Sequence, residues 1–388
     1  MDNLREESAK MCLDVITPIN IGTGTTLGAK EYLYDPKKQQ VYFLNLPAWH
    51  KFIYEKHLLR AYEEYIDRRK KDNLLSWLKN KGYTIEDVKD CLIGSALAEV
   101  NTRDATQKQT LNDILTQMKH PDGTMYIPGS SIKGIFRTAI LYNQLQKNAP
   151  VKSRYWNRVK DKISNPKFKP RDKEIKKITI DLEADLLHKT QLSETPFDNA
   201  NAVLSTLRGL QVSDTYDSDN LNAAVLQKID VGFDNRTGKV SPHAISVFRE
   251  CILPGGRLYF DVKLDKTFTR LVGVNSINDL LTQTQQFFNA VLSLLNTAFG
   301  NYYPDPFQDT DRANMFVGSN TGFLSKTLLA FLAPTPVEAK ETIKILLDKS
   351  FRNHKHILHD KVISPRTLKV TSYQGRYLLM GLGRVSKL

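Results

Sequence analysis

The sequence predicts an α+β fold, and three observations support this prediction. Residues 10–44 alternate apolar and polar side chains as strands do, and residues 246–265 repeat the pattern around a Pro-Gly-Gly turn. Apolar residues recur at helical spacing after the first strands and again in residues 277–299. The chain has 388 residues, which favours two or three domains, or one domain with large insertions.

Turn residues separate the first predicted elements. The stretch "KMCLDVITPINIGTG" predicts a strand that ends in a turn at Gly22 and Gly24, and "KEYLYDPKKQQVYFLN" predicts a hairpin around Asp35 and Pro36. Helical stretches follow from residue 46, so we expect a helical insertion over about residues 45–117.

The stretch "MYIPGSSIKGIFRTAILYNQL" predicts a short strand, a turn and a helix that ends near residue 147. A helix N-terminus carries partial positive charge and unpaired N–H groups, so Lys133 and Arg137 in its first turns oppose the dipole unless an anion binds there. One interpretation is a phosphate-binding turn. The other is an ordinary cap by Ser130 or Ser131, with both cations solvated.

Residues 151–177 hold eleven Lys or Arg against three Asp or Glu, whereas the whole chain has a net charge of +13. Such a concentration of charge predicts a basic insertion or linker that contacts RNA or DNA, with Tyr155 and Trp156 available for stacking. A solvated charged surface is the alternative. The overall excess also favours a polyanionic partner, either nucleic acid or an anionic surface.

The second half of the chain, residues 178–388, returns to strands and helices. "SVFRECILPGGRLYFDVKLD" predicts a hairpin that turns at Pro254, Gly255 and Gly256. Helices are expected at residues 277–299 and 336–349, and a glycine-bearing segment precedes the second helix and another follows it. This order of elements suggests two related α+β halves.

No persuasive catalytic or metal site stands out in the sequence. His354, His356 and His359 with Asp360 could form a metal or acid/base site, although a basic loop whose histidines help to bind phosphate fits better. Asp214, Asp217 and Asp219 lack the glycine and glutamate of a calcium loop, so we interpret them as capping residues in a turn. We therefore expect neither a metal nor a cofactor.

The three cysteines, Cys12, Cys91 and Cys251, stand far apart, which makes a disulfide framework or cysteine zinc site improbable and fits a reducing compartment. The N-terminus has no signal-peptide pattern, and no apolar stretch is long enough to span a bilayer. A cytoplasmic protein is expected.

Several segments resemble the RAMP superfamily of CRISPR-associated RNA-binding proteins. The stretches that carry the resemblance are "PINIGTGT", "YIPGSSIKGIFRTAI", "LQVSDT" and "LPGGRLYFDVKLD". Further along, "NTGFLSKT", "ISPRTLKVT" and "YLLMGLGRV" resemble the RAMP subunit that caps the 3′-end side of the guide RNA in type III-A (Csm) effector complexes.

This resemblance implies RRM-like (ferredoxin-like) RAMP cores with antiparallel sheets, helical insertions and a basic insertion. It implies an N-terminal RAMP domain at 1–150, the basic segment at 151–177 and a second RAMP-like region at 178–388. It also implies binding of the guide RNA (crRNA) backbone, beside an adjacent RAMP backbone subunit and a small helical subunit. The residues expected to bind RNA are Gly22, Thr23, Gly24, Ser130, Ser131, Lys133, Arg137, Lys152, Arg154, Arg158, Arg366, Lys369, Gly381, Gly383 and Arg384.

Two departures from the family pattern bear on activity. Many members carry a histidine before the first glycine turn, where this chain has Asn20. We find no equivalent of the aspartate with which the repeating backbone subunit cleaves target RNA, since Asp14 lies inside the first strand. We therefore expect a non-catalytic subunit that supports crRNA maturation and antiviral defence.

The alternative is a RAMP endoribonuclease that processes precursor crRNA. Those enzymes resemble this chain and carry a glycine-rich C-terminal loop, but here "MGLGRVSKL" is short. His50 and His57 lie on a helix whose apolar spacing indicates packing.

Overall fold

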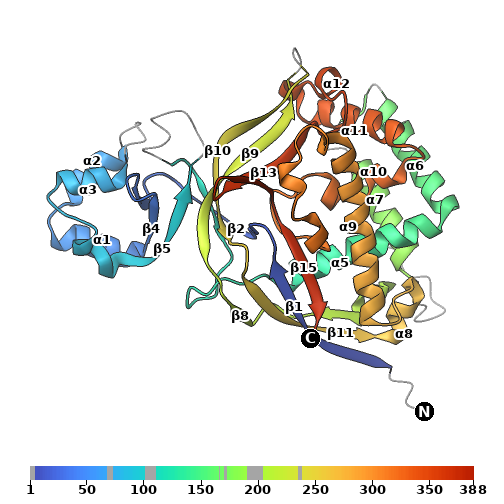
Figure 1. The fold of residues 1–388 in the computed structure, drawn as a ribbon, viewed down its shortest axis with the longest axis horizontal. Helices are drawn as coiled ribbons and strands as arrows, with labels where there is room; N and C mark the ends of the chain where they lie inside the picture. Colours follow the sequence, from blue (N-terminus) through green and yellow to red (C-terminus); the bar gives the residue numbers. More distant parts are fainter. Residues whose placement is uncertain are drawn as a thin grey trace.

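The computed structural model describes residues 5–67, 73–100, 111–165, 167–169, 173–189, 204–234 and 238–388. Two β-sheets form the centre of the molecule, and most of the helices cover one side of it (Figure 1). Within the described part of the chain, no helix is both long and apolar enough to cross a membrane.

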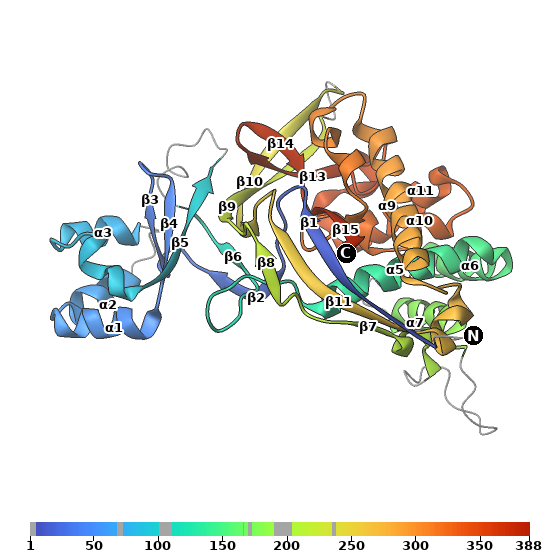
Figure 2. The ribbon, with the colours of Figure 1, turned by 60° about the horizontal axis from the view of Figure 1, so that its bottom comes forward.

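The first sheet has the strand order β12-β15-β1-β11-β7, with β8 also paired to β11. Figure 2 shows β1, β11 and β7 side by side. Its strands are β1 (Glu6–Val15), β7 (Leu210–Val212), β8 (Asp217–Asp219), β11 (Arg257–Asp265), β12 (Met315–Phe316) and β15 (Leu382–Lys387). Each strand pair in it is antiparallel.

Two long helices complete this sheet as a ferredoxin-like unit. Helix α5 (Gly129–Lys147) lies between β1 and β7 in the chain, and α9 (Ile277–Phe299) lies between β11 and β15. The order β1-α5-β7-β11-α9-β15 with spatial order β15-β1-β11-β7 is the β-α-β-β-α-β arrangement expected from the sequence. The α+β prediction is confirmed.

Apolar periodicity explains how the helices pack on the sheet. Met11 and Leu13 alternate along β1 with side chains on the other face, and both are fully buried. On α5, Ile132, Phe136 and Ile140 recur every four residues and join the same core cluster.

The second sheet has the order β2-β6-β10-β9-β5-β4-β3, and β13 and β14 extend it from β9. Most pairs are antiparallel, but β10 pairs with β6 and β5 pairs with β9 in parallel. Its strands are β2 (Gly22–Leu27), β3 (Tyr32–Asp35), β4 (Gln40–Leu44), β5 (Leu92–Glu99), β6 (Ile114–Gln117), β9 (Ala223–Phe233), β10 (Val240–Ile252), β13 (Thr367–Tyr373) and β14 (Arg376–Leu379).

The predicted hairpin around Pro254 to Gly256 is wrong, because its two strands belong to different sheets. Strand β10 pairs with β9 and β6, whereas β11 pairs with β1, β7 and β8. The turn instead closes against β1, since Val15 donates its N–H to the Gly256 carbonyl at 2.9 Å and accepts from Gly255 at 2.9 Å. A long-range partner therefore replaces the local one.

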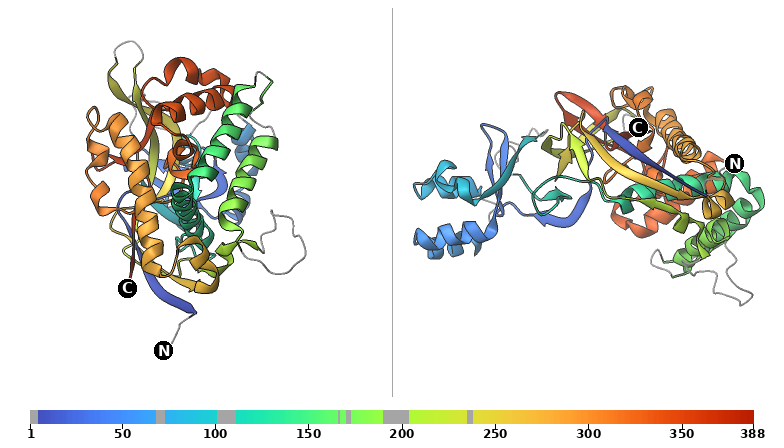
Figure 3. Two further views of the ribbon diagram at one scale, coloured as in Figure 1. Left: turned by 90° about the vertical axis from the view of Figure 1, so that its right-hand side faces the viewer. Right: turned by 90° about the horizontal axis from the view of Figure 1, so that it is seen from below.

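A small lobe projects from the second sheet, as Figures 1 and 3 show. The predicted hairpin at Asp35 is confirmed, and α1 (Leu46–Glu55), α2 (Leu59–Asp67), α3 (Leu74–Asn80) and a 3-10 turn (Glu86–Cys91) follow it. Trp49, Tyr65 and Trp77 fill the lobe's own core. The expected helices reach only Cys91, because β5 and β6 occupy residues that we expected to be helical.

The basic segment at 151–177 is largely helical and packed. Helix α6 (Ala149–Ser164) buries Tyr155 and Trp156, which are 2% and 3% exposed, so neither ring is available for stacking on a base. Helix α7 (Lys173–Leu187) packs against α6. Residues 166 and 170–172 of this segment lie outside the described residues.

The remaining helices are α8 (Lys266–Thr269), α10 (Leu329–Leu332), α11 (Pro336–Ser350) and α12 (His356–His359). Both sheets draw strands from the predicted regions 1–150 and 178–388, so these regions interlock rather than each closing its own sheet. Whether the predicted regions fold as independent domains stays a prediction.

Candidate nucleic-acid interface

A groove of about 310 Å³ runs between α5, the start of β2 and the segment after β12; we call it the glycine-loop groove. It is lined by Ile21, Gly22, Ser131, Gly134, Ile135, Thr138, Phe316, Gly318, Ser319, Thr321, Ser325 and Lys326. Small residues and hydroxyl groups dominate this lining, which leaves space for a chain to approach the backbone closely. Two of the predicted RNA-binding residues, Gly22 and Ser131, meet here.

The glycine loop itself, residues 318–322, turns through left-handed backbone conformations. Gly318 has φ +85° and Gly322 has φ +89°, and Asn320 between them has φ 61°. A Cβ on Gly318 would lie 2.3 Å from the Asn20 carbonyl oxygen, so only glycine fits there. Ser319 donates its N–H to the same carbonyl at 2.7 Å, which fixes the loop to the segment between β1 and β2.

Asn20 is buried, and its side chain forms hydrogen bonds to two different segments. The side-chain NH₂ of Asn20 donates to the backbone carbonyl of Glu250 at 2.7 Å, and the side-chain oxygen Oδ1 of Asn20 accepts from the Ser319 hydroxyl. The residue is 0% exposed, so its role in this structure is to hold the loop in place.

The serine cap, one of the two interpretations of the start of α5, is wrong. The helix begins at Gly129 with Pro128 as the capping residue, and neither serine supplies a side-chain cap. Instead, the Asp214 carboxylate accepts the Gly129 N–H at 2.7 Å. An anion does occupy this helix N-terminus, but the protein supplies it. Asp214 is therefore a capping residue as interpreted, whereas Asp217 and Asp219 lie in strand β8 and not in a turn.

Lys133 and Arg137 on α5 have different environments. Arg137 donates to both carboxylate oxygens of Glu183 on α7, with the Nε–Oε1 distance at 2.7 Å. Lys133 has no ion pair among the described residues, and partial burial lowers the pKa of its ammonium group. Lys133 is therefore the more available of the two for an external anion.

Acids on α7 pair with two of the eleven cations of the basic segment. Arg154 pairs with Asp185, and Arg158 pairs with Asp181 at 2.7 Å. Lys152 is more weakly held, through a 3.5 Å hydrogen bond to Gln146. The concentration of charge in the sequence thus overstates the free positive charge of this surface.

The first glycine segment lies at the rim of the groove as an exposed strand, and the turn predicted there is wrong. Gly22 and Thr23 belong to β2, whose register shifts between Gly22 and Thr26. Gly24 has φ +85° within this irregularity, and the Thr23 and Thr116 hydroxyls are 2.7 Å apart. The exposed backbone and hydroxyl groups face solvent here.

The C-terminal glycines support packing. A Cβ on Gly381 would lie 2.3 Å from the Val317 carbonyl oxygen, and one on Gly383 would lie 2.8 Å from Leu13. Arg384 is exposed on β15 and lines a separate cleft of about 280 Å³ together with Arg257 and Arg312.

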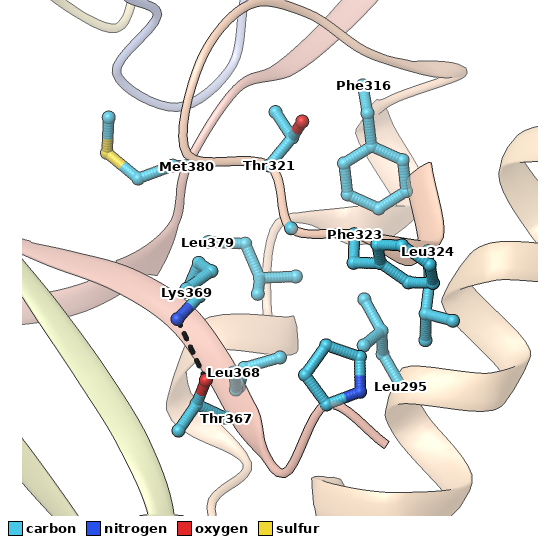
Figure 4. Close-up of a pocket in the computed structure, with 12 residues that line it drawn as sticks. Leu295, Phe316, Thr321, Phe323, Leu324, Thr367, Leu368, Lys369, Leu379 and Met380 are labelled. Carbon is cyan, nitrogen blue, oxygen red and sulfur yellow. Dashed lines mark hydrogen bonds between the residues drawn. The ribbon is translucent and has the colours of Figure 1, made fainter. Parts of the chain in front are cut away.

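Arg366 and Lys369 are both ion-paired. Arg366 pairs with the buried Asp360 at 3.0 Å, and Lys369 pairs with Asp230 at 2.8 Å. Figure 4 shows Lys369 beside the glycine loop with its hydrogen bond to Thr367.

In the histidine cluster, His356 belongs to a buried hydrogen-bond network around Asp360. His356 is buried with its Nδ1 2.8 Å from the Asp360 carboxylate, which also accepts from the Ser364 hydroxyl at 2.7 Å. In the part of the chain that the structure describes, no group of three His, Cys, Asp or Glu side chains is placed to hold a metal ion.

Sequence reasoning missed three residues of the interface: Arg249, Ser319 and Lys326. The segment "FVGSNTGFLSKT" carried a signal, since glycines let the backbone approach an anion closely and a lysine follows nearby, but no such signal surrounds Arg249. Arg249 reaches the loop from β10 by donating its Nε–H to the Ser319 hydroxyl at 3.2 Å.

The site is therefore part of a ferredoxin-like α+β unit whose glycine loop borders an open groove. Residues 12–303 match the family model of the RAMP superfamily, and the chain belongs to that family.

Known relatives agree with this assignment. The chain is similar to the CRISPR system Cms protein Csm5 of Enterococcus italicus, at 23% identity over 90% of this chain and 87% of that protein. The Csm5 protein of Mycobacterium tuberculosis is likewise 23% identical, over 96% of this chain and 95% of its own length.

Two solved structures share the fold. One chain of a cryo-EM Csm–crRNA–target RNA ternary complex of a type III-A CRISPR-Cas system matches with a TM-score of 0.61 and 18% identity, covering 98% of this chain and 100% of that one. The crystal structure of T. onnurineus Csm5 matches with a TM-score of 0.55 and 18% identity, over 88% of this chain and 94% of that one.

Proposed function

We propose that this protein is a subunit of a type III-A CRISPR effector (Csm) complex and binds the backbone of the crRNA in its 3′ region. The observation that carries the proposal is the glycine-loop groove, in which the first glycine segment, α5 and residues 318–326 converge. Glycine backbone, hydroxyl groups and a lysine contact phosphates without reading bases. The Csm5 relatives and the Csm–crRNA complex support the same assignment.

The subunit acts without catalysis in this proposal. Among the described residues that line the groove, Lys326 is the one titratable side chain, so no acid–base pair is available to activate a ribose 2′-hydroxyl. The adjacent RAMP backbone subunit and the small helical subunit are the proposed protein partners, and the projecting lobe at residues 32–67 and 73–99 offers one surface for them.

The proposal is tested by measuring RNA binding to the purified protein over a range of salt concentrations. Replacing Lys326 with Gln should weaken binding of a single-stranded repeat-derived RNA and reduce the salt slope by about one unit. Lys51→Gln, on the far lobe and paired with Glu55, is the matched control and should bind as the unchanged protein does. An unchanged protein that binds no RNA at low salt would contradict the proposal.

The endoribonuclease alternative is tested in the same preparation. Labelled precursor RNA should stay intact with and without magnesium. Reproducible cleavage that is lost on replacing His50 or His57 would favour the enzyme.

A further inference from the structure

Beneath the glycine loop, the second sheet presents a cluster of charged side chains. Lys369 on β13 is paired in register with Asp230 on β9, so both side chains lie on the same face of the sheet. Arg249 reaches the loop through Ser319, and Gly322 lies against Lys369, since a Cβ on this glycine would be 3.9 Å from the lysine Cγ. Lys326 ends the loop segment on the groove side.

The charges in this cluster do not balance. Asp230 is the one carboxylate found among these described residues, and it pairs with Lys369 at 2.8 Å and with Lys228 at 3.7 Å. Arg249 and Lys326 form no ion pair within the described chain. The cluster therefore carries four cations against one anion.

Some buried polar atoms of this cluster also lack hydrogen-bond partners. The Nη1 atom of Arg249 is buried without a hydrogen-bond partner in the described structure, and so is the Oδ1 atom of Asp230. Burial lowers the pKa of Lys326, and the nearby Arg249 guanidinium lowers it further. Burial likewise lowers the pKa of Arg249 and of Lys369. Like charges in a desolvated site destabilise the free protein, and an anion with several acceptor oxygens would relieve this.

We propose that Arg249, Lys326 and Lys369 form a pocket for one phosphate group, and this proposal rests on the proposed RNA-binding function. Asp230 is the internal anion that competes with the phosphate for the same cations. The phosphate enters from the glycine-loop groove, where Lys326 and the hydroxyl of Ser319 or Thr321 reach it first. A phosphate offers acceptor oxygens in several directions, which suits cations that come from three separate elements.

The phosphate group that binds in this pocket can come from a phosphodiester within the RNA chain or from a terminal 3′-phosphate. Four probes distinguish them: a single-stranded RNA with a 3′-hydroxyl, the same RNA with a 3′-phosphate, the same RNA with one neutral methylphosphonate linkage, and inorganic phosphate as competitor. Tighter binding of the 3′-phosphate form assigns the pocket to the chain end. Equal binding of both ends, with a loss at the methylphosphonate, assigns it to an internal linkage.

The decisive prediction is a pair of effects with opposite sign in the full-length protein. Lys326→Gln and Arg249→Gln should each weaken RNA binding about tenfold, the size of one charge-assisted hydrogen bond. Asp230→Asn should tighten binding by about two- to fivefold, because the phosphate then meets no competing carboxylate. Lys326→Arg should restore most of the affinity, and Lys51→Gln should leave it unchanged.

Asp230→Asn removes the internal anion and can lower the stability of the free protein. Its melting temperature should then rise more on RNA addition than that of the unchanged protein, since ligand binding relieves the excess charge. If it does not fold, the double variant Asp230→Asn/Lys369→Gln removes one charge of each sign and should still outbind Lys369→Gln.

Either of two results would overturn the pocket: full affinity and an unchanged salt slope in both Lys326→Gln and Arg249→Gln, or weaker binding by folded Asp230→Asn. If the unchanged protein binds RNA while these variants bind equally well, only the pocket fails. If the unchanged protein binds no RNA, the proposed function fails as well.

Discussion

The Asp214 carboxylate accepts a 2.7 Å hydrogen bond from the backbone N–H of Gly129, the first residue of α5. The contact joins the "LQVSDT" and "PGSS" segments, which are far apart in the sequence. A Cβ on Gly129 would lie 2.4 Å from the Val212 carbonyl oxygen, so the approach of β7 to the helix start requires glycine. The RAMP motif at this helix therefore has a structural function.

Replacing Asp214 with Ala should destabilise the protein by about 1 kcal/mol, because the helix loses its capping acceptor and a favourable charge at its N-terminus. Chemical denaturation monitored by circular dichroism measures this difference. Asp214→Asn keeps an acceptor and should lose less. Equal stability of the unchanged protein and Asp214→Ala would show that the contact contributes nothing.

Lys133 and Arg137 in the first turns of α5 should respond differently to substitution. Lys133→Gln should reduce RNA affinity and flatten its salt dependence, since this ammonium group has no internal counter-ion within the described residues. Arg137→Gln should mainly lower the melting temperature, because it leaves the Glu183 carboxylate unpaired. RNA titrations at several salt concentrations and thermal melts of both variants separate the two effects. The reverse pattern would contradict the assignment.

A side chain should cost more stability at one end of the glycine loop than at the other. Gly318→Ala should cost about 2 kcal/mol or more, because it adds left-handed strain to a clash with the Asn20 carbonyl. Gly322→Ala has a similar φ, but its nearest neighbour is the flexible Lys369 side chain at 3.9 Å, so it should cost less. Denaturation of the two variants side by side is the measurement, and a larger loss for Gly322→Ala would refute the argument.

Glu7 should make stability depend on pH in the acid range. Burial raises the pKa of this carboxyl, but contacts with Lys266 at 3.1 Å, the Ile277 N–H at 3.4 Å and Lys387 at 3.6 Å outweigh it, and the net pKa falls below 4.5. Its stabilisation is complete above pH 4.5 and is lost as the pH falls through the lowered pKa.

A comparison with Glu7→Gln measures this contribution. The stability difference between the two proteins should be constant near neutral pH and should shrink on acidification below pH 4.5. A difference that stays constant down to low pH would mean that the ion pairs add no net stability.

Local sequence patterns were sufficient to predict single helices and the first hairpin. The buried spacing of Ile132, Phe136 and Ile140 and the turn at Asp35 were sufficient to place α5 and the first hairpin. The pairing of β11 with β1 was not predictable from spacing, because a Pro-Gly-Gly turn between two apolar strands normally closes a hairpin. Tertiary pairing with a strand more than 240 residues earlier decided the outcome.

The candidate site shows the same limit. Gly22 and Ser131 were predicted from motifs and lie on the groove, whereas Arg249 sits in a strand with no local sign of function. The charge of residues 151–177 predicted a free basic surface, but the acids that neutralise Arg154 and Arg158 come from α7. Net charge in a sequence window does not include such partners.

Crosslinking of the crRNA in the assembled complex is the most direct test of whether this subunit binds the 3′ region of the crRNA. The tagged protein is purified from its host with bound RNA, irradiated, and the crosslinked crRNA positions are sequenced. We expect recovery of repeat-derived crRNA with other Csm subunits, crosslinks confined to the 3′ region, and a lower yield of these crosslinks in Lys326→Gln. Crosslinks at the 5′ end, or recovery of the protein without crRNA, would contradict it.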